Sequence, residues 1–190
     1  MTFNGWVQIV LFCVVVLLLT RPVGGYLDAV MAGRRTLLSP VLLPVERGFY
    51  RLAGIRADEE QSWWLYCRDL LIFHIAGYVL LYLLLRLQGL LPFNPQGIAA
   101  VPPDLAGNTA MSFITNTNWQ AYAGERAMSY LSQMMGLAVQ NYLSAATGIA
   151  LALALVRGFA RANAKGIGNF WADLVRATLY VLLPACIVLT

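Results

Sequence analysis

Long uncharged apolar segments constrain this chain more than any other feature. An α-helix rises about 1.5 Å per residue, so about 20 apolar residues are needed to cross a hydrocarbon layer about 30 Å thick. Three segments meet this requirement, at residues 5–20, 70–91 and 130–156, and a fourth begins near Leu174 and is still apolar at Thr190. Charged residues make up 12% of the sequence, about half the share of a soluble domain. We therefore expect an all-α integral membrane protein whose fourth span is incomplete, and a water-soluble enzyme is excluded.

The cations alternate between the two sides of these spans. Lys and Arg are retained on the cytoplasmic side of short loops. Between the second and third spans there are only Arg86 and Arg126, whereas the flanking regions are rich in cations. The first cation, Arg21, follows the first apolar segment, which argues against a signal peptide. We therefore expect a multi-pass protein with its N-terminus outside. The cytoplasmic cations would be Arg21, Arg34, Arg35, Arg47, Arg51, Arg56 and Arg68 in the first loop, and Arg157, Arg161, Lys165 and Arg176 after the third span.

These spans divide the chain into four parts. Residues 1–21 are expected to form an N-terminal transmembrane helix, and residues 22–68 a cytoplasmic segment. Residues 69–157 would form one pore unit, and residues 158–190 a cytoplasmic link with the incomplete helix. Several arginines of the cytoplasmic segment are candidates to contact anionic lipid or a partner subunit. They are Arg34, Arg35, Arg47 and Arg51.

The region between the second and third spans does not have the pattern of a simple loop. Pro103 and Asp104 form a typical helix start before an apolar stretch, which predicts a helix over residues 104–114. That helix would span only about 15 Å, half a membrane. Polar residues follow at 115–120, and polar backbone is tolerated at membrane depth only where protein buries it or where it lines a watery path. We therefore expect a re-entrant pore helix and an extended filter strand over residues 115–118.

This order of elements is that of the pore loops of potassium channels. There the carbonyl oxygens of an extended strand replace the hydration shell of a cation. The carboxyl end of the short helix would add roughly half a negative charge near the site. A desolvated cation is therefore favoured there.

One stripe of the third span is small and polar. Gly136, Gln140, Ser144 and Gly148 recur at steps of four and so share one helix face. Small residues allow close packing and polar ones hydrogen-bond to neighbouring helices, so helix packing alone would explain the stripe. Because the stripe follows a candidate filter, we favour the second interpretation, in which Gln140 and Ser144 support the lining of a pore.

The sequence offers little for other metal or redox chemistry. Cys13, Cys67 and Cys186 are far apart and lack the spacing of a metal or redox motif. His74 has no second imidazole with which to share a metal, and we expect it to be packed or hydrogen-bonded in its helix. No metal site beyond that for a transported ion is expected. Nor is nucleic acid an expected partner, since no stretch combines clustered cations with exposed aromatic residues.

Several of these motifs resemble the potassium-binding subunit of the bacterial Kdp potassium-transporting ATPase. Residues 108–120 are similar to that family's first pore helix and filter strand, and residues 132–146 to the helix that follows. The Arg21-Pro22 pair and residues 91–95 match in order and spacing. The resemblance covers the whole chain but only the beginning of the family, whose members carry four linked pore units of the potassium-transporter superfamily behind an extra first helix.

The resemblance also implies a function, a place and partners. The complex would lie in the bacterial plasma (inner) membrane, bind extracellular potassium in this subunit, and pass it to an ATP-hydrolysing P-type ATPase subunit. Accessory subunits and membrane lipid would be the other partners, and potassium would be the substrate, with no further cofactor. The chain itself would be non-catalytic, since it has no phosphate-binding loop or aspartyl-phosphate motif. By this resemblance the filter strand is Thr115, Asn116, Thr117 and Asn118, and Gln120 lies at its outer mouth.

Two other classes of protein remain. The first is a truncated remnant or a structural or assembly subunit with no complete pore of its own, in which Asn116 and Asn118 serve only hydrogen bonding. The second is a membrane enzyme, which is weakened by a single histidine and by the lack of a carboxylate pair in a span.

Overall fold

The computed structural model describes residues 2–160 and 166–189, and within these ranges it consists of helices and loops. This confirms the all-α prediction. Arg161 and Lys165, which were counted among the cytoplasmic cations, lie outside the described residues. The elements are α1 (Phe3–Met31), α2 (Ser39–Ala53), α3 (Trp63–Leu87), the 3-10 turn η1 (Gln88–Leu90), α4 (Pro103–Ile114), α5 (Gly124–Ala127), the π-helical segment η2 (Ser132–Ala138), α6 (Val139–Ala160), α7 (Phe170–Arg176), the π-helical segment η3 (Ala177–Leu182) and α8 (Leu183–Leu189).

Four continuous helical stretches are long and apolar enough to cross a membrane. They include the fourth apolar segment, which begins at Phe170, where the Asn169 side chain accepts a hydrogen bond from the amide of Ala172 at 3.2 Å. The four stretches are Phe3–Met31, Trp63–Leu90, Ser132–Ala160 and Phe170–Leu189.

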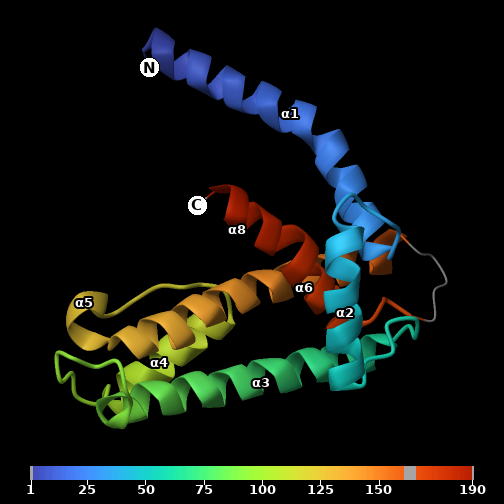
Figure 1. The fold of residues 1–190 in the computed structure, drawn as a ribbon. Coiled ribbons are helices and arrows are strands. Elements are labelled where there is room, and N and C mark those ends of the chain that lie inside the picture. Colours follow the sequence, from blue (N-terminus) through green and yellow to red (C-terminus); the bar gives the residue numbers. More distant parts are fainter. Residues whose placement is uncertain (1, 161–165, 190) are drawn as a thin grey trace.

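The body of the molecule is a bundle in which α4 packs against both α3 and α6 (Figure 1). One apolar cluster joins α3, α4 and η2 and includes Leu85, Ala110 and Leu137. A second cluster lies at the other end of α3, where the rings of Tyr66, Phe73 and Trp171 meet Phe170 edge-on with centroids 5.5, 5.9 and 5.1 Å away. Such edge-on pairs add to the energy of simple burial, so this cluster joins α3 firmly to α7.

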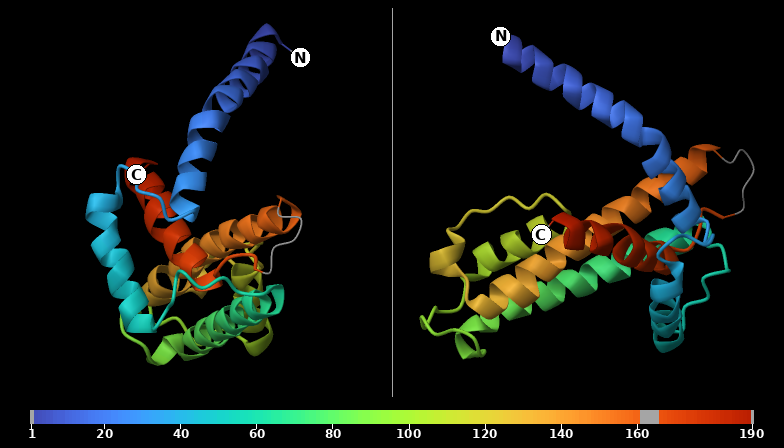
Figure 2. Two further views of the ribbon diagram at one scale, coloured as in Figure 1. Left: turned by 90° about the vertical axis from the view of Figure 1, so that its right-hand side faces the viewer. Right: turned by 45° about the horizontal axis from the view of Figure 1, so that its top comes forward.

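The first helix is longer than predicted. The prediction ended it at Arg21 and Pro22, but α1 continues through Pro22 to Met31. Proline removes the donor only at its own nitrogen, and a membrane helix tolerates that loss. Beyond it Val30 and Met31 are buried in the second cluster, so packing favours continuation of the helix. The rest of α1 projects away from the bundle (Figure 2).

The loop after α1 contains the helix α2, for which the sequence analysis predicted no element. Glu46 is 5% exposed in this helix and accepts hydrogen bonds from Tyr50 and Tyr180, both at 2.7 Å. Arg176 of α7 donates to the same carboxylate at 3.1 Å. A buried carboxylate requires partners of this kind, and here they fix α2 across the end of the bundle.

A second buried ion pair joins α6 to α7. Arg157 donates to both carboxylate oxygens of Asp173, which is 2% exposed. The hydroxyl of Tyr66 in α3 donates to Asp173 at 3.2 Å and to the carbonyl of Ala150 at 2.9 Å. Three helices therefore share one polar network at this end.

Candidate functional site

The short helix α4 starts at one end of α3 and ends beside its middle. The amide of Val101, just before α4, donates to the carbonyl of Leu85 at 3.2 Å, and the Val101 carbonyl accepts from Arg86. At its other end, Ile114 lines a cavity together with His74, near the middle of α3. The predicted helix 104–114 agrees with the observed Pro103–Ile114, in which Asp104 occupies the first turn. The residues after α4 are thus held about halfway along the bundle.

The backbone after α4 folds back onto the end of that helix. The amides of Thr117 and Asn118 both donate to the carbonyl of Ser112, at 3.1 and 3.2 Å, and the amide of Asn116 donates to the carbonyl of Phe113 at 3.4 Å. In a planar trans peptide the carbonyl points opposite to the N–H of the next residue. The carbonyls of residues 115, 116 and 117 therefore point away from the end of α4.

These carbonyl oxygens are unpaired within the described part of the chain. No hydrogen bond from any described residue reaches the carbonyls of residues 115–118. Residues 115–117 are exposed, and backbone carbonyls are strong hydrogen-bond acceptors. The arrangement can therefore bind a donor or a cation.

The segment is not a regular extended strand as predicted. Asn116 and Asn118 have left-handed backbones with φ of 60° and 54°, whereas Thr115 has φ −85°. Asparagine accepts this region more readily than most residues other than glycine. The reason for the difference is that one carbonyl, that of Ser112, captures two successive amides.

The hydroxyl groups of the segment fix its backbone. Thr115 donates to the carbonyl of Met111 at 2.9 Å, and Thr117 donates to the carbonyl of Ser112 at 3.0 Å. Ser112 itself donates to the carbonyl of Trp119 at 2.9 Å. Gln120, predicted at the outer mouth, is exposed.

Two polar atoms in this region are buried without a hydrogen-bond partner among the described residues. They are the Oδ1 atom of Asn118 and the hydroxyl of Tyr122. Burial raises the pKa of Tyr122 to about 12, so its hydroxyl remains protonated at neutral pH. Each atom leaves a hydrogen-bonding position open. Both residues lie within or close in sequence to residues 115–118, which we call the carbonyl segment.

Helix α6 forms the wall opposite the segment. The hydroxyl of Ser144 donates to Oδ1 of Asn116 at 3.3 Å, and Gly148 lies one turn further along, where an added Cβ would be 3.5 Å from Nδ2 of Asn116. The structure therefore brings Ser144 and Asn116 together. The cavity that they share is otherwise mainly apolar and is lined by Leu70, Leu71, His74, Ile75, Tyr78, Met111, Ile114, Thr115, Thr147, Gly148 and Leu151.

Gln140, the other residue predicted to support a pore lining, is not among the residues that line this cavity. Its side chain is 7% exposed and packs against α3, where a Cβ added to Gly77 would lie 3.2 Å from Oε1. Gly136 likewise faces Leu81 and Leu84 of α3. The stripe therefore packs helices in its first half and faces the carbonyl segment in its second. The same helix face contacts α3 along its first half and the carbonyl segment along its second half, and periodicity in the sequence cannot distinguish these two neighbours.

Gln88, for which no role was predicted from the sequence, is completely buried at the end of α3. Its Nε2 donates to the carbonyls of Ala99 and Ala127 at 2.7 and 2.9 Å. Its Oε1 accepts from the amide of Ser129 at 3.1 Å and from the hydroxyl of Ser132 at 2.9 Å. One amide group thus joins the end of α3 to the segment before α4 and to the start of η2. A glutamine within an otherwise apolar span was the available signal.

Comparisons with known proteins identify sequence relatives of this chain. The family described as "Potassium-transporting ATPase A subunit" matches residues 10–190. Curated relatives named "Potassium-transporting ATPase potassium-binding subunit" include those of Brucella anthropi, 62% identical over 190 residues, and of Methylorubrum populi, 63% identical over 190 residues. The matches cover 100% of this chain but 34% and 33% of those relatives. The chain therefore spans about a third of the length of these similar proteins.

Proposed function

The chain belongs to the potassium-transporting ATPase A subunit family, and we propose that its residues 115–118 form one part of a filter that binds extracellular potassium through backbone carbonyls. The observation that carries this proposal is the direction of three successive carbonyls. They point away from α4 and accept no hydrogen bond from the described residues. Carbonyl oxygens in this state are the ligands with which pore loops replace the hydration shell of potassium.

The end of α4 supports the same proposal electrostatically. Its last carbonyls carry the negative end of the helix dipole, equivalent to about half an elementary charge. No lysine or arginine is among the residues that line the adjacent cavity. A monovalent cation is therefore favoured, and an anion is disfavoured.

One such segment supplies only part of a cation's coordination shell. The chain spans about a third of the relatives' length, 34% for the Brucella anthropi protein. We propose that further pore units complete the ring, with α4 as the re-entrant helix of the first. Thr115, Asn116, Thr117 and Asn118 would then line one side of the ring, with Gln120 at its mouth and Ser144 behind it.

The ion would leave this subunit towards an ATP-hydrolysing partner. The relatives' names describe a potassium-binding subunit of a potassium-transporting ATPase. We assign this chain the corresponding non-catalytic role, next to a P-type ATPase subunit and accessory subunits in the bacterial inner membrane. Potassium is its substrate.

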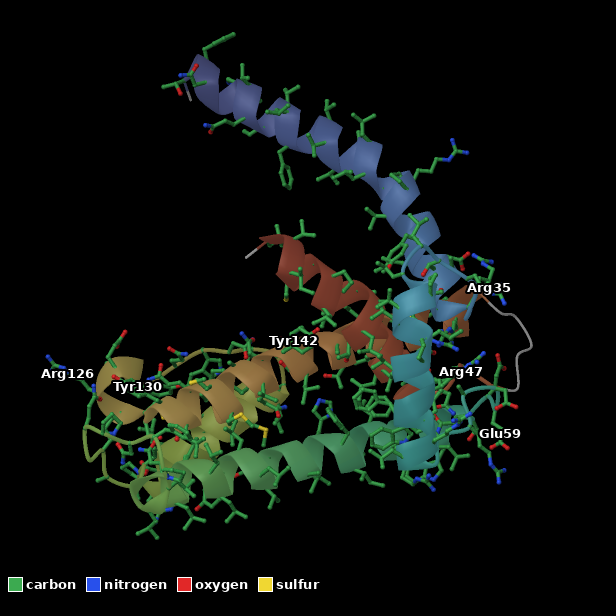
Figure 3. The ribbon with its side chains drawn as sticks, viewed as in Figure 1. Arg35, Arg47, Glu59, Arg126, Tyr130 and Tyr142 are labelled. Carbon is green, nitrogen blue, oxygen red and sulfur yellow. The ribbon has the colours of Figure 1, made fainter. Side chains whose placement is uncertain are left out.

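The charge distribution supports an orientation with the N-terminus outside. Arg35, Arg47 and Glu59 lie at one end of the bundle, and Arg126 and Tyr130 lie at the other (Figure 3). The first end carries most of the arginines and is assigned to the cytoplasm. In this orientation α4 and α5 lie towards the outside, and an ion would reach the carbonyl segment from that side.

A second candidate is a structural or assembly role. The observation that favours it is the large exposed apolar surface of α1 and α8, including Leu17, Leu18 and Val188. Such faces can dock other membrane helices without transporting an ion.

The test uses a complex whose potassium-binding subunit carries this sequence. Asn116→Val should strain the left-handed backbone, whereas Asn116→Gly should retain it. We expect the half-saturating potassium concentration for ATP-driven uptake to rise about tenfold more for Asn116→Val than for Asn116→Gly, since left-handed backbone costs a non-glycine residue about 1–2 kcal/mol. Normal uptake with reduced recovery of the complex would favour the assembly role.

A further inference from the structure

Helix α2 lies across the end of the bundle (Figure 1). One of its faces is apolar and exposed. Val41, Val45, Phe49 and Leu52 follow one another at steps of four and three, so they share a face. They are 72%, 44%, 50% and 88% exposed. The buried Glu46 lies to one side of this face, about 100° around the helix from its middle. The helix therefore presents an unpartnered apolar stripe, defined by these four residues.

Exposed arginines lie on the other side of the apolar stripe from the buried Glu46. Arg47 and Arg51 are one turn apart on α2, and Arg35 precedes the helix. None of the three forms an ion pair with a described residue. Figure 3 shows Arg35 and Arg47 at the same end of the molecule as Glu59. Cations therefore gather at the level of α2.

Aromatic residues mark the same level of the molecule. Trp63 and Trp64, at the start of α3, are 69% and 59% exposed. Tryptophan is enriched at the boundary between membrane and water. A helix at this level that runs across the spans lies along the boundary.

We propose that α2 is an interfacial helix that binds the anionic phospholipid leaflet at the arginine-rich end of the spans. Its apolar stripe enters the acyl region, and Arg35, Arg47 and Arg51 pair with lipid phosphates. The charge complementarity between unpaired arginines and anionic headgroups, beside an exposed apolar stripe, identifies this occupant. The proposal does not depend on potassium binding, so each can fail without the other.

The position of the stripe can be measured with spin labels. The 190-residue chain, with its three cysteines changed to serine, is placed in nanodiscs of phosphatidylcholine and phosphatidylglycerol. A nitroxide at Val45→Cys should be accessible to oxygen and protected from a water-soluble nickel chelate. At the control Glu59→Cys, on an exposed loop at the same end, the label should show the reverse. Protection of the Val45→Cys label from both reagents would mean that protein covers the stripe, and access to nickel would mean that water does; either result overturns the proposal.

The requirement for anionic lipid has its own readout. Native mass spectrometry of the purified chain should show phosphatidylglycerol retained in preference to phosphatidylcholine. The double variant Arg47→Gln/Arg51→Gln should retain about 25-fold less phosphatidylglycerol, because each of the two cations near an anionic surface contributes about fivefold. The control Arg126→Gln removes an exposed arginine at the opposite end and should change nothing. Equal retention by the two variants would overturn the role of the α2 arginines.

Discussion

The hydroxyl of Ser144 in α6 lies 3.3 Å from Oδ1 of Asn116 and 3.0 Å from the carbonyl of Asn141, and it shares its one proton between the two acceptors. The contact to Asn116 links the second half of the α6 stripe to the carbonyl segment. Asn116 needs such a contact because its left-handed backbone, with φ of 60°, costs energy. A side chain on a rigid helix can hold the residue in place. The link therefore ties the geometry of the carbonyls to the packing of α6.

Removing this hydroxyl should weaken potassium uptake by the complex. A hydrogen bond of this kind contributes about 0.5–1.5 kcal/mol, so Ser144→Ala should raise the half-saturating potassium concentration by roughly twofold to tenfold. Thr147→Ala is the matched control, because the Thr147 hydroxyl bonds only to carbonyls of its own helix among the described residues. The measurement is the potassium dependence of uptake by the complex with each variant. Identical kinetics for the two would contradict a positioning role for Ser144.

Replacing Gln88 should destabilise the end of the bundle from which α4 starts. Gln88→Leu would leave two carbonyls, an amide and a hydroxyl without their partner, and an unsatisfied buried group costs about 1–3 kcal/mol. We expect a loss of about 3 kcal/mol or more in the free energy of unfolding. Denaturant unfolding of the purified chain is the measurement. The exposed Gln120→Leu should stay within about 0.5 kcal/mol of the wild type, and a similar result for Gln88→Leu would show that the amide contacts are dispensable.

A larger residue at Gly136 should separate α3 from η2. A Cβ there would lie 2.9 Å from Cδ2 of Leu84 and 3.0 Å from Cδ1 of Leu81. Overpacking of this kind costs about 1–3 kcal/mol, so Gly136→Leu should lower the thermal midpoint of the chain. Gly158→Leu places the same side chain on α6 where nothing lies within 4 Å, and it should unfold like the wild type. Equal midpoints for both variants would contradict the close contact.

Acid should loosen α2 from the bundle through Glu46. Burial raises the pKa of this carboxyl, but hydrogen bonds from Tyr180, Tyr50 and Arg176 and the charge of Arg176 together lower the pKa below its ordinary value. The charged form therefore stabilises the fold fully above the unfolded pKa of about 4.3, and this stabilisation is lost as the pH falls through the lower folded value. Hydrogen exchange of α2 amides should increase in acid for the wild type.

Two variants separate this effect from general acid unfolding. Glu46→Gln should show faster exchange in α2 already at neutral pH and little further change in acid. Glu46→Ala should cost about 3–5 kcal/mol, because Arg176 would be left buried without its partner. The control Asp28→Asn breaks an exposed pair with Arg34 and should cost at most about 1 kcal/mol. An unchanged acid response in Glu46→Gln would assign the effect to another group.

Local sequence signals predicted the elements that depend on them. Pro103 and Asp104 set the start of α4 because they act within one turn, and apolar length identified the spans. The extension of α1 past Pro22 could not be foreseen, since it depends on the burial of Val30 and Met31 against helices more than a hundred residues away. The amphipathic pattern of α2 was present in the sequence, but the arginines and prolines around it obscured it.

The site was predicted only in part, again because its geometry depends on contacts between residues distant in sequence. Steps of four placed Gln140 and Ser144 on one face, but which neighbour that face meets depends on where α4 ends. The four contacts of Gln88 reach residues 11 to 44 positions away. Periodicity has no information on such pairings. The left-handed backbone of Asn116 and Asn118 is consistent with asparagine but does not require it.

The separation of α1 from the bundle has a consequence for how the chain is built. Within the described residues its buried part is confined to Val30 and Met31, and Tyr26 hydrogen-bonds to the carbonyl of Tyr180 at 2.6 Å. Most of its length therefore gains nothing from tertiary contacts. Insertion of this helix into lipid and its association with the other helices are separate events, and the first can be complete while the remainder of the protein is still being synthesised.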